Sequence, residues 1–395
     1  MRTSIENDKL IIYLEGRIDS ANAAETQKQI DEAMAANPGC RPVIDADALA
    51  YISSAGLRVL LQLTKKLDER LSVRNTSPEV YEILEMTGFT DLLNVTKRLR
   101  TMSVEGCEII GRGAIGTVYR VDEDTIVKVY EQPDSLPMIE NEQRRAKQAF
   151  LKGIPTAISY DVVKVGDKYG SVFELLKAKT YNDVVIEHPE LLDETIRDYA
   201  HFIRSVHAVE MEPGELPAAR DVYLSYLDAL QGTLPGELSD ALRRLLAAMP
   251  ENRHVVHGDI QMKNVMLSGN EPLLIDMDTL SVGDPVFDLM GAYVTYVQFN
   301  EDEPDNTEKF VGISRDVCAE IWNKLLSCYF DDRDARVIPE AEKRIRIVAC
   351  VRFLFILLVL HIGKPELMQI RTAHTLDHLR ELLPTVEGLA IGELN

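Results

Sequence analysis

The 395-residue chain has the composition of a globular protein, because 46% of its residues are hydrophobic and 27% are charged. Its length predicts two or three compact units with sizeable cores. The formal net charge of −21 argues against a nucleic-acid partner, because a phosphate backbone requires a basic surface. An acidic surface suits solubility or a cationic substrate.

The spacing of the cysteines and the length of the apolar runs indicate the cellular compartment. The five cysteines form no C-x-x-C pair, which argues against a disulfide framework or a cysteine metal site. No charged-then-apolar signal sequence opens the chain. The strongest apolar run, 353–360, is about half the length that a bilayer crossing needs. We therefore expect a cytoplasmic protein without a membrane anchor, with this run in a buried helix.

The first hundred residues alternate between strand and helix patterns. The expected strands are 9–18, 42–46 and 71–73, and the expected helices are 22–36, 58–70 and 78–86. Such alternation predicts an α/β unit built on a mostly parallel sheet.

Three segments of this unit carry a family resemblance: LEGRID at 14–19, YISSAGL at 51–57 and MTGF at 86–89. They resemble the STAS domain of anti-sigma factor antagonists, over residues 1–99. The resemblance implies regulation or the binding of a protein partner. It also implies a phosphorylated serine at a helix N-terminus, and Ser54 matches that position. The flanking Ser53 and Ala55 depart from the usual motif, which has Asp before the serine and Ser or Thr after it.

Ser54 has two interpretations. A helix N-terminus leaves amide hydrogens unpaired and carries partial positive charge. A phosphate there would be stabilised, and it would add about two negative charges to a binding face. Alternatively, Ser53 or Ser54 simply caps the helix, because serine is a preferred capping residue.

A glycine-rich segment follows a short basic linker. Gly111, Gly113 and Gly116 form a G-x-G-x-x-G run, and such glycines let a backbone approach phosphate oxygens. A dinucleotide-binding domain would place a helix directly after them. Here, strand patterns follow at 117–121 and 125–130, which is the arrangement of a kinase nucleotide loop.

Lys128 lies on the second of these strands. In a kinase, this lysine contacts the α- and β-phosphates of ATP and pairs with a helix glutamate. Glu140 and Glu142 both lie in the next helical stretch. We favour Glu142, because an apolar stripe formed by Ala146, Ala149 and Phe150 would then lie behind it.

The strongest signal is the run HVVHGDIQMKN at 254–264, followed by Asp276 at the end of an apolar segment. Asp259 and Asn264 fit the H-x-D-x-x-x-x-N frame. An acid at the position of Asp259 can orient or deprotonate a hydroxyl. An amide at Asn264 and a carboxylate at Asp276 can hold Mg²⁺ on the phosphates of ATP.

These motifs resemble the aminoglycoside phosphotransferase and choline kinase branch of the protein-kinase-like fold, over residues 104–395. Gly258 stands where protein kinases usually carry Arg. The GDPVFDL run at 283–289 resembles the turn after the metal-binding Asp, in which Asp288 would anchor the catalytic loop. The resemblance implies an α+β bilobal domain, with an N-lobe at 104–178 and a C-lobe at 179–395.

Chain order places a hinge between these lobes, where backbone groups near Glu174 and Leu176 would meet adenine. His257 is expected to hold the catalytic loop. Lys263 either neutralises charge on the transferred group or is solvated, and Asp278 either assists a metal or bonds backbone.

The region after residue 294 is expected to be helical, with helices at 313–326, 340–362 and 365–383, which in this branch wall the acceptor site. The acidic loop 300–305 could attract a cationic group. We favour a solvated loop, because charge runs usually face water.

Three functional hypotheses follow. The first is ATP- and Mg²⁺-dependent phosphorylation of a small-molecule hydroxyl, on an amino sugar, a sugar or an amino alcohol. The second is phosphorylation of a protein serine, including Ser54, because fusion to a kinase gives the serine a high effective concentration. The third is a non-catalytic adaptor that senses nucleotide and binds a partner through the STAS-like unit.

Overall fold

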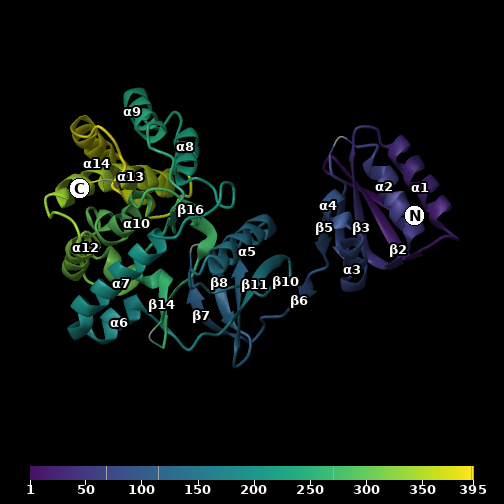
Figure 1. The fold of residues 1–395 in the computed structure, drawn as a ribbon, viewed down its shortest axis with the longest axis horizontal. Helices are drawn as coiled ribbons and strands as arrows, with labels where there is room; N and C mark the ends of the chain where they lie inside the picture. The colour runs from purple at the N-terminus through teal and green to yellow at the C-terminus, as the bar shows by residue number, and fades with distance from the viewer. Residues whose placement is uncertain (68, 114, 270, 393, 395) are drawn as a thin grey trace. The chain divides into compact units, whose positions relative to one another are not determined.

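The computed structural model describes residues 1–395 except 68, 114, 270, 393 and 395. The chain divides into two compact units, 1–102 and 103–395, whose elements are labelled in Figure 1. None of the helices in the described part of the chain combines the length and apolarity that a bilayer crossing requires.

The first unit is a five-stranded sheet with helices, in the order β1-β2-β3-β4-β5. β1 is antiparallel to β2, and the other neighbours are parallel. The strands are β1 (Arg2–Glu6), β2 (Lys9–Ile18), β3 (Arg41–Ile52), β4 (Ser72–Thr76) and β5 (Asn94–Lys97). The helices are α1 (Ala23–Ala36), α2 (Ser54–Thr64), α3 (Pro78–Met86) and α4 (Phe89–Leu92), and the two-residue strand β6 (Arg100–Thr101) follows.

The predicted α/β class is confirmed, but two strands at the sheet edges were not expected. β1 and β5 have no buried residue, so neither carries the apolar alternation by which a strand is recognised. The expected helix 58–70 was also wrong in its bounds. α2 begins at Ser54 because the Ser53 hydroxyl accepts a hydrogen bond from the amide of Ala55 at 3.2 Å, which is an N-cap.

The second unit begins with antiparallel strands in the order β10-β11-β9-β8-β7. They are β7 (Glu108–Arg112), β8 (Gly116–Arg120), β9 (Thr125–Tyr130), β10 (Asp161–Val165) and β11 (Lys168–Glu174), and helix α5 (Leu136–Leu151) joins β9 to β10. The two strands expected after the glycines are confirmed. The apolar stripe of α5 is narrower than expected, because Ala146 and Ala149 are buried while Phe150 is 53% exposed.

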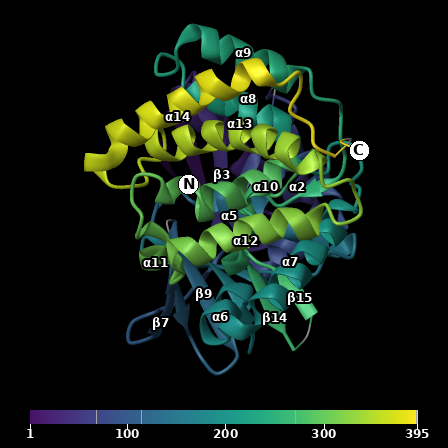
Figure 2. The same cartoon turned by 90° about the vertical axis from the view of Figure 1, so that its left-hand side faces the viewer.

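The rest of the second unit is mainly helical. Its helices are α6 (Tyr181–Glu187), α7 (Leu192–His207), α8 (Ala219–Ala229), α9 (Gly236–Ala247), α10 (Val286–Tyr296), α11 (Asn306–Val311), α12 (Arg315–Tyr329), α13 (Val337–Leu358) and α14 (Met368–Leu382). Its short strands are β12 (Lys179–Thr180), β13 (Val255–Val256), β14 (Val265–Ser268), β15 (Glu271–Leu274) and β16 (Ser281–Val282). Figure 2 shows α13 lying between α14 and α10. Of the apolar run expected in a buried helix, Phe353, Leu354 and Leu357 are buried on α13, whereas Leu360 lies beyond its end and is 45% exposed.

The acidic loop 300–305 is not the solvated loop that was expected. Glu303 is only 6% exposed and pairs with the buried Arg371 at 3.0 Å. Lys364 and Lys309 contact the same carboxylate at 2.5 and 3.4 Å. Glu303 is therefore the buried centre of an ion-pair network, whose cations come from α14, from the loop before α14 and from the neighbouring α11.

Candidate active site

The glycine run forms the turn between β7 and β8. Gly111 lies on β7 and Gly116 opens β8, while the amide of Gly113 donates to the carbonyl of Gly116 at 2.9 Å. A Cβ at Gly116 would lie 2.5 Å from the carbonyl oxygen of Val129. Glycine at 116 is therefore required for the close approach of β8 to β9, the strand that carries Lys128.

Lys128 joins three elements of the second unit. Its ammonium nitrogen lies 3.5 Å from Glu142 Oε1 on α5 and 2.5 Å from Asp276 Oδ1. Burial lowers the pKa of Lys128, but Asp276 and Glu142 outweigh it, so the net pKa is raised and the side chain stays cationic. Glu142, and not Glu140, is therefore the glutamate that pairs with Lys128. Tyr130 Oη donates to the second oxygen of Glu142 at 2.6 Å, which holds that carboxylate in position.

Asp259 and Asn264 lie together on the loop after β13. The Asn264 side-chain amide donates to the Asp259 carbonyl at 2.9 Å and to its Oδ2 at 3.0 Å. Gln261 Nε2 donates to the same carboxylate oxygen at 3.2 Å. Two amides therefore orient the Asp259 carboxylate. The sequence pattern gave no signal for Gln261.

A fully buried carboxylate, Asp288, anchors this loop. It accepts hydrogen bonds from the amides of His257 and Gly258 at 2.9 and 2.5 Å. His207 Nε2 bonds it at 2.8 Å. Burial raises the pKa of Asp288, but the hydrogen bond from His207 and the charge of His207 lower it by a larger amount. The net pKa is therefore below its ordinary value.

The predicted anchoring role of Asp288 is confirmed. His257 also serves the loop, because its Nε2 hydrogen-bonds to the carbonyl of Ile275 at 2.9 Å. His207, at the end of α7, is a further residue of this network that the sequence did not point to. Its Nδ1 hydrogen-bonds to the Tyr329 hydroxyl at 2.7 Å, and neither contact has a local sequence signature.

The backbone conformation and the packing at position 258 require glycine. Its φ is +84°, and a Cβ there would lie 2.8 Å from the carbonyl oxygen of Thr279. The Thr279 hydroxyl also donates to the carbonyl of His257 at 2.7 Å. The segment after Asp276 thus packs so closely on the loop that carries Asp259 that a side chain at position 258 would displace it.

The carboxylates near Lys128 and Asp259 bear on metal binding. Burial first, and then the charge of Glu142, raise the pKa of Asp278 to about 6. Asp276 is 46% exposed, and Asn264 is nearly buried. No group of three or more His, Cys, Asp or Glu within the described ranges could hold a metal ion alone. Mg²⁺ usually takes one or two protein ligands and completes its shell with phosphates and water, so these residues fit an ion that arrives with a nucleotide.

Two other sets of predicted residues lie elsewhere. Glu174 ends β11, and the amide of Leu175 donates to the carbonyl of Asp124 at 2.7 Å; Leu176 follows as the chain leaves the sheet for β12. In the first unit, Ser53 takes the capping position of α2, and Ser54 is exposed in the first turn.

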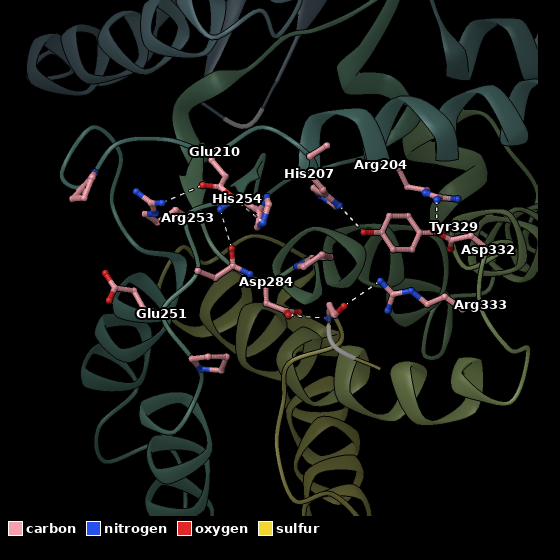
Figure 3. A pocket seen from close by; sticks show the side chains of 16 residues that line it. Arg204, His207, Glu210, Glu251, Arg253, His254, Asp284, Tyr329, Asp332 and Arg333 are labelled. Atoms are coloured by element: carbon pink, nitrogen blue, oxygen red, sulfur yellow. Dashed lines mark hydrogen bonds and ion pairs between the residues drawn. The ribbon is translucent and has the colours of Figure 1, made fainter. Parts of the chain in front are cut away.

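A cavity of about 770 Å³ lies apart from the predicted residues. Figure 3 shows His207 and Tyr329 in its wall, with Asp284 and Arg333 holding the chain near Gly392. Its lining contains none of Lys128, Glu142, Asp259, Asn264 or Asp276. Its lining shares His207 with the hydrogen bonds around Asp288.

The fold and site define a protein-kinase-like phosphotransferase preceded by a STAS domain. The model of the phosphotransferase enzyme family matches residues 106–313, and the STAS domain model matches residues 1–102. The chain therefore belongs to the phosphotransferase enzyme family, and it carries an N-terminal STAS domain.

Individual relatives are known for both parts. The chain is 39% identical over 93 residues to the putative anti-sigma factor antagonist BtrV of Bordetella bronchiseptica, covering 22% of this chain and 76% of the relative. It also resembles solved aminoglycoside phosphotransferases. For ADP-bound APH(2'')-Ib, the identity is 15%, the TM-score 0.47 and the coverage 70% of this chain and 93% of the other. For APH(4)-Ia, the identity is 13%, the TM-score 0.48 and the coverage 71% of this chain and 94% of the other.

Proposed function

We propose that this protein transfers the γ-phosphoryl group of ATP, with Mg²⁺, to a hydroxyl group of a small molecule. We propose that its STAS domain serves regulation or the binding of a protein partner. The observation that supports the proposal is the convergence of Lys128, Glu142 and Asp276 on one side of the site, next to a loop that orients Asp259 and Asn264.

The residues divide into nucleotide and acceptor roles. Lys128 and the loop containing Gly111, Gly113 and Gly116 hold the phosphates, and backbone groups near Glu174 and Leu176 face adenine. Asn264 and Asp276 hold the metal ion, which supplies neutralisation of phosphate charge when bound. Glu142 keeps Lys128 in place through the 3.5 Å ion pair.

Asp259 orients the acceptor. The hydroxyl oxygen bonds to the γ-phosphorus as the bond from that phosphorus to the β,γ-bridging oxygen breaks, and ADP leaves with the electron pair. The hydroxyl proton passes to the Asp259 carboxylate, which Asn264 and Gln261 hold in position. A positioned base of this kind contributes about 10²- to 10⁴-fold to the rate.

The test is Asp259→Ala in the full-length protein. We expect turnover to fall by about 10²- to 10⁴-fold, while the affinity for Mg²⁺-ATP, measured by calorimetry, stays close to wild type. Asp198→Ala, at an exposed position on α7, is the matched control and should change neither quantity. Loss of nucleotide binding together with turnover in Asp259→Ala would argue against the role assigned to Asp259.

A protein serine is the second candidate acceptor, and the exposure of Ser54 favours it. Because Ser53 caps α2, the Ser54 hydroxyl is not needed for capping, and a phosphate there would face the positive end of the helix. Incubation of the protein alone with ATP and Mg²⁺ should then add one phosphate by intact mass, and Ser54→Ala should abolish the addition. An unchanged mass would exclude modification of this chain by itself.

A further inference from the structure

Near its C-terminal end, the described chain forms a strap across the second unit, defined here as residues 389–392. Leu389 and Ile391 are 1% and 0% exposed, and both side chains belong to the hydrophobic core of this unit. Between them, the carbonyl of Ala390 accepts a hydrogen bond from Arg344, on α13, at 2.5 Å. The strap is neither helix nor strand, yet both its backbone and its side chains hold it in place.

A buried carboxylate holds one side of the strap. Asp284, which is 4% exposed, accepts hydrogen bonds from the amides of Ile391 and Gly392 at 2.9 Å each. The oxygen that receives the Ile391 amide also receives the amide of Val286, the first residue of α10, at 3.0 Å. One carboxylate therefore ties the strap to the start of α10.

A guanidinium group holds the other side of the strap. Arg333 donates to the carbonyls of Ile391 and Gly392 at 3.1 Å each. It also donates to the carbonyl of Leu394 at 2.8 Å. Figure 3 shows Arg333 and Asp284 on opposite sides of this segment. Hydrogen bonds with an ionised partner are about twice as strong as neutral ones, so two charged side chains clamp the backbone of the strap.

The clamp lies one helical turn from the residue that anchors the loop carrying Asp259. Asp288, in the first turn of α10, accepts hydrogen bonds from the amides of His257 and Gly258. Gly258 directly precedes Asp259 in the chain. A contiguous set of hydrogen bonds and one rigid helix turn thus joins the strap to this loop, which is the kind of physical connection that can carry coupling between distant groups.

We propose that the strap is a positioning element for the loop that carries Asp259, and that it acts through the start of α10 and Asp288. The inference rests on the proposed function and adds a means of regulating it, because anything that lifts the strap from Asp284 would loosen the loop. Lys128 and Glu142 lie on β9 and α5, outside this path. Nucleotide binding should therefore not depend on the strap.

The first experiment measures hydrogen exchange in the full-length protein. Arg333→Gln removes the charged donor but keeps the buried side chains of the strap. We expect the amides of His257 and Gly258 to exchange about tenfold faster, the factor that the loss of one hydrogen bond gives. Arg333→Lys should lie in between, because it keeps the charge but not the fork of N–H groups. Unchanged exchange at these two amides in Arg333→Gln would overturn the inference.

Two further variants exclude trivial causes. Arg336→Gln removes a charge three residues away, where the side chain is 90% exposed, and should change nothing. Gly392→Ala keeps every donor and acceptor of the clamp, but its Cβ would lie 3.1 Å from Asp284 Oδ2 and should displace the strap. We expect it to change the same two amides as Arg333→Gln, by a smaller factor. Faster exchange spread evenly over α7, α12 and α13 would show general destabilisation and overturn the inference.

A double-mutant cycle tests the path through Asp288. If the strap acts through this carboxylate, Arg333→Gln should accelerate exchange at His257 and Gly258 less in an Asp288→Asn background than in the wild-type protein, because groups in one network do not contribute additively. Independent effects of the two substitutions would show that the strap does not act through Asp288, and would refute the proposed path.

Turnover and nucleotide affinity separate this inference from the proposed function. Transfer of label from γ-labelled ATP to glucosamine, glucose or ethanolamine should fall about tenfold in Arg333→Gln, while the calorimetric affinity for Mg²⁺-ATP stays within about twofold of wild type. Transfer at the wild-type rate, or an equal loss of nucleotide affinity, would retain the function and refute the role of the strap. Faster exchange at His257 and Gly258 in Arg333→Gln, together with no transfer by the wild-type protein, would retain the strap and refute the function for these acceptors.

Discussion

Replacing Asp288 with alanine should destabilise the kinase-like unit and misplace its catalytic loop. The carboxylate is 0% exposed and accepts from the amides of His257 and Gly258 and from His207. Each donor left unpaired costs about 1–3 kcal/mol. Because the three share one partner, their losses do not add fully. Breaking a buried charged pair by removing one member costs about 3–5 kcal/mol, which we take as the magnitude.

The assay is scanning calorimetry of the full-length protein. At about 2–4 °C per kcal/mol for large domains, the transition of unit 103–395 should fall by about 6–20 °C. The STAS transition should stay unchanged, and Asp288→Asn should lie in between, because its amide keeps one acceptor oxygen. Asp198→Ala, at an exposed position, should shift the transition by less than about 2 °C.

The pH dependence has a definite sign. The pKa of Asp288 is lower in the folded protein than in the unfolded chain, so its stabilisation is complete above about pH 4 and is lost as pH falls through the folded value. The contribution of Asp288 to the difference in unfolding free energy between wild type and Asp288→Ala should therefore be constant from about pH 6 to 8. A shift of under about 2 °C at pH 7 would refute the anchoring role.

Three further substitutions test separate contacts. Gly258→Ala should lower turnover and stability, because φ is +84° and the new Cβ would lie 2.8 Å from a carbonyl oxygen; wild-type kinetics and melting would contradict this. Glu142→Gln should weaken Mg²⁺-ATP binding by removing the charge that pairs with Lys128, and an unchanged calorimetric affinity would argue against the pairing. Arg371→Ala should lower the unfolding free energy by about 3–5 kcal/mol, because it leaves Glu303 without its buried partner. An unfolding free energy from urea denaturation within about 0.5 kcal/mol of wild type would show that Lys364 and Lys309 are sufficient partners for Glu303.

The local motifs could be read from the sequence because phosphate handling needs particular residues at fixed spacing. Lys128 and Glu142 do meet, and Asp259 and Asn264 share hydrogen bonds. Strand pattern after the glycines was enough to separate a kinase loop from a dinucleotide loop.

Contacts between distant segments could not be predicted in this way. The acidic loop was expected to be solvated, yet Glu303 pairs with Arg371, 68 residues away. His207 bonds Asp288 across 81 residues, and Arg352 meets Tyr226 across 126. None of these pairs has a periodicity or a short motif, because packing of the helices alone brings them together.

The most direct test of the central claim follows the γ-phosphoryl group of ATP. The full-length protein is incubated with Mg²⁺, γ-labelled ATP and a set of amino sugars, sugars and amino alcohols. Label is measured in the protein and in the small molecules by mass spectrometry, with Asp259→Ala in parallel. We expect label on a small-molecule hydroxyl, none on the protein, and none in the variant. Label confined to Ser54 would make this a protein kinase, and tight nucleotide binding with no transfer to any acceptor would make it a nucleotide-sensing adaptor.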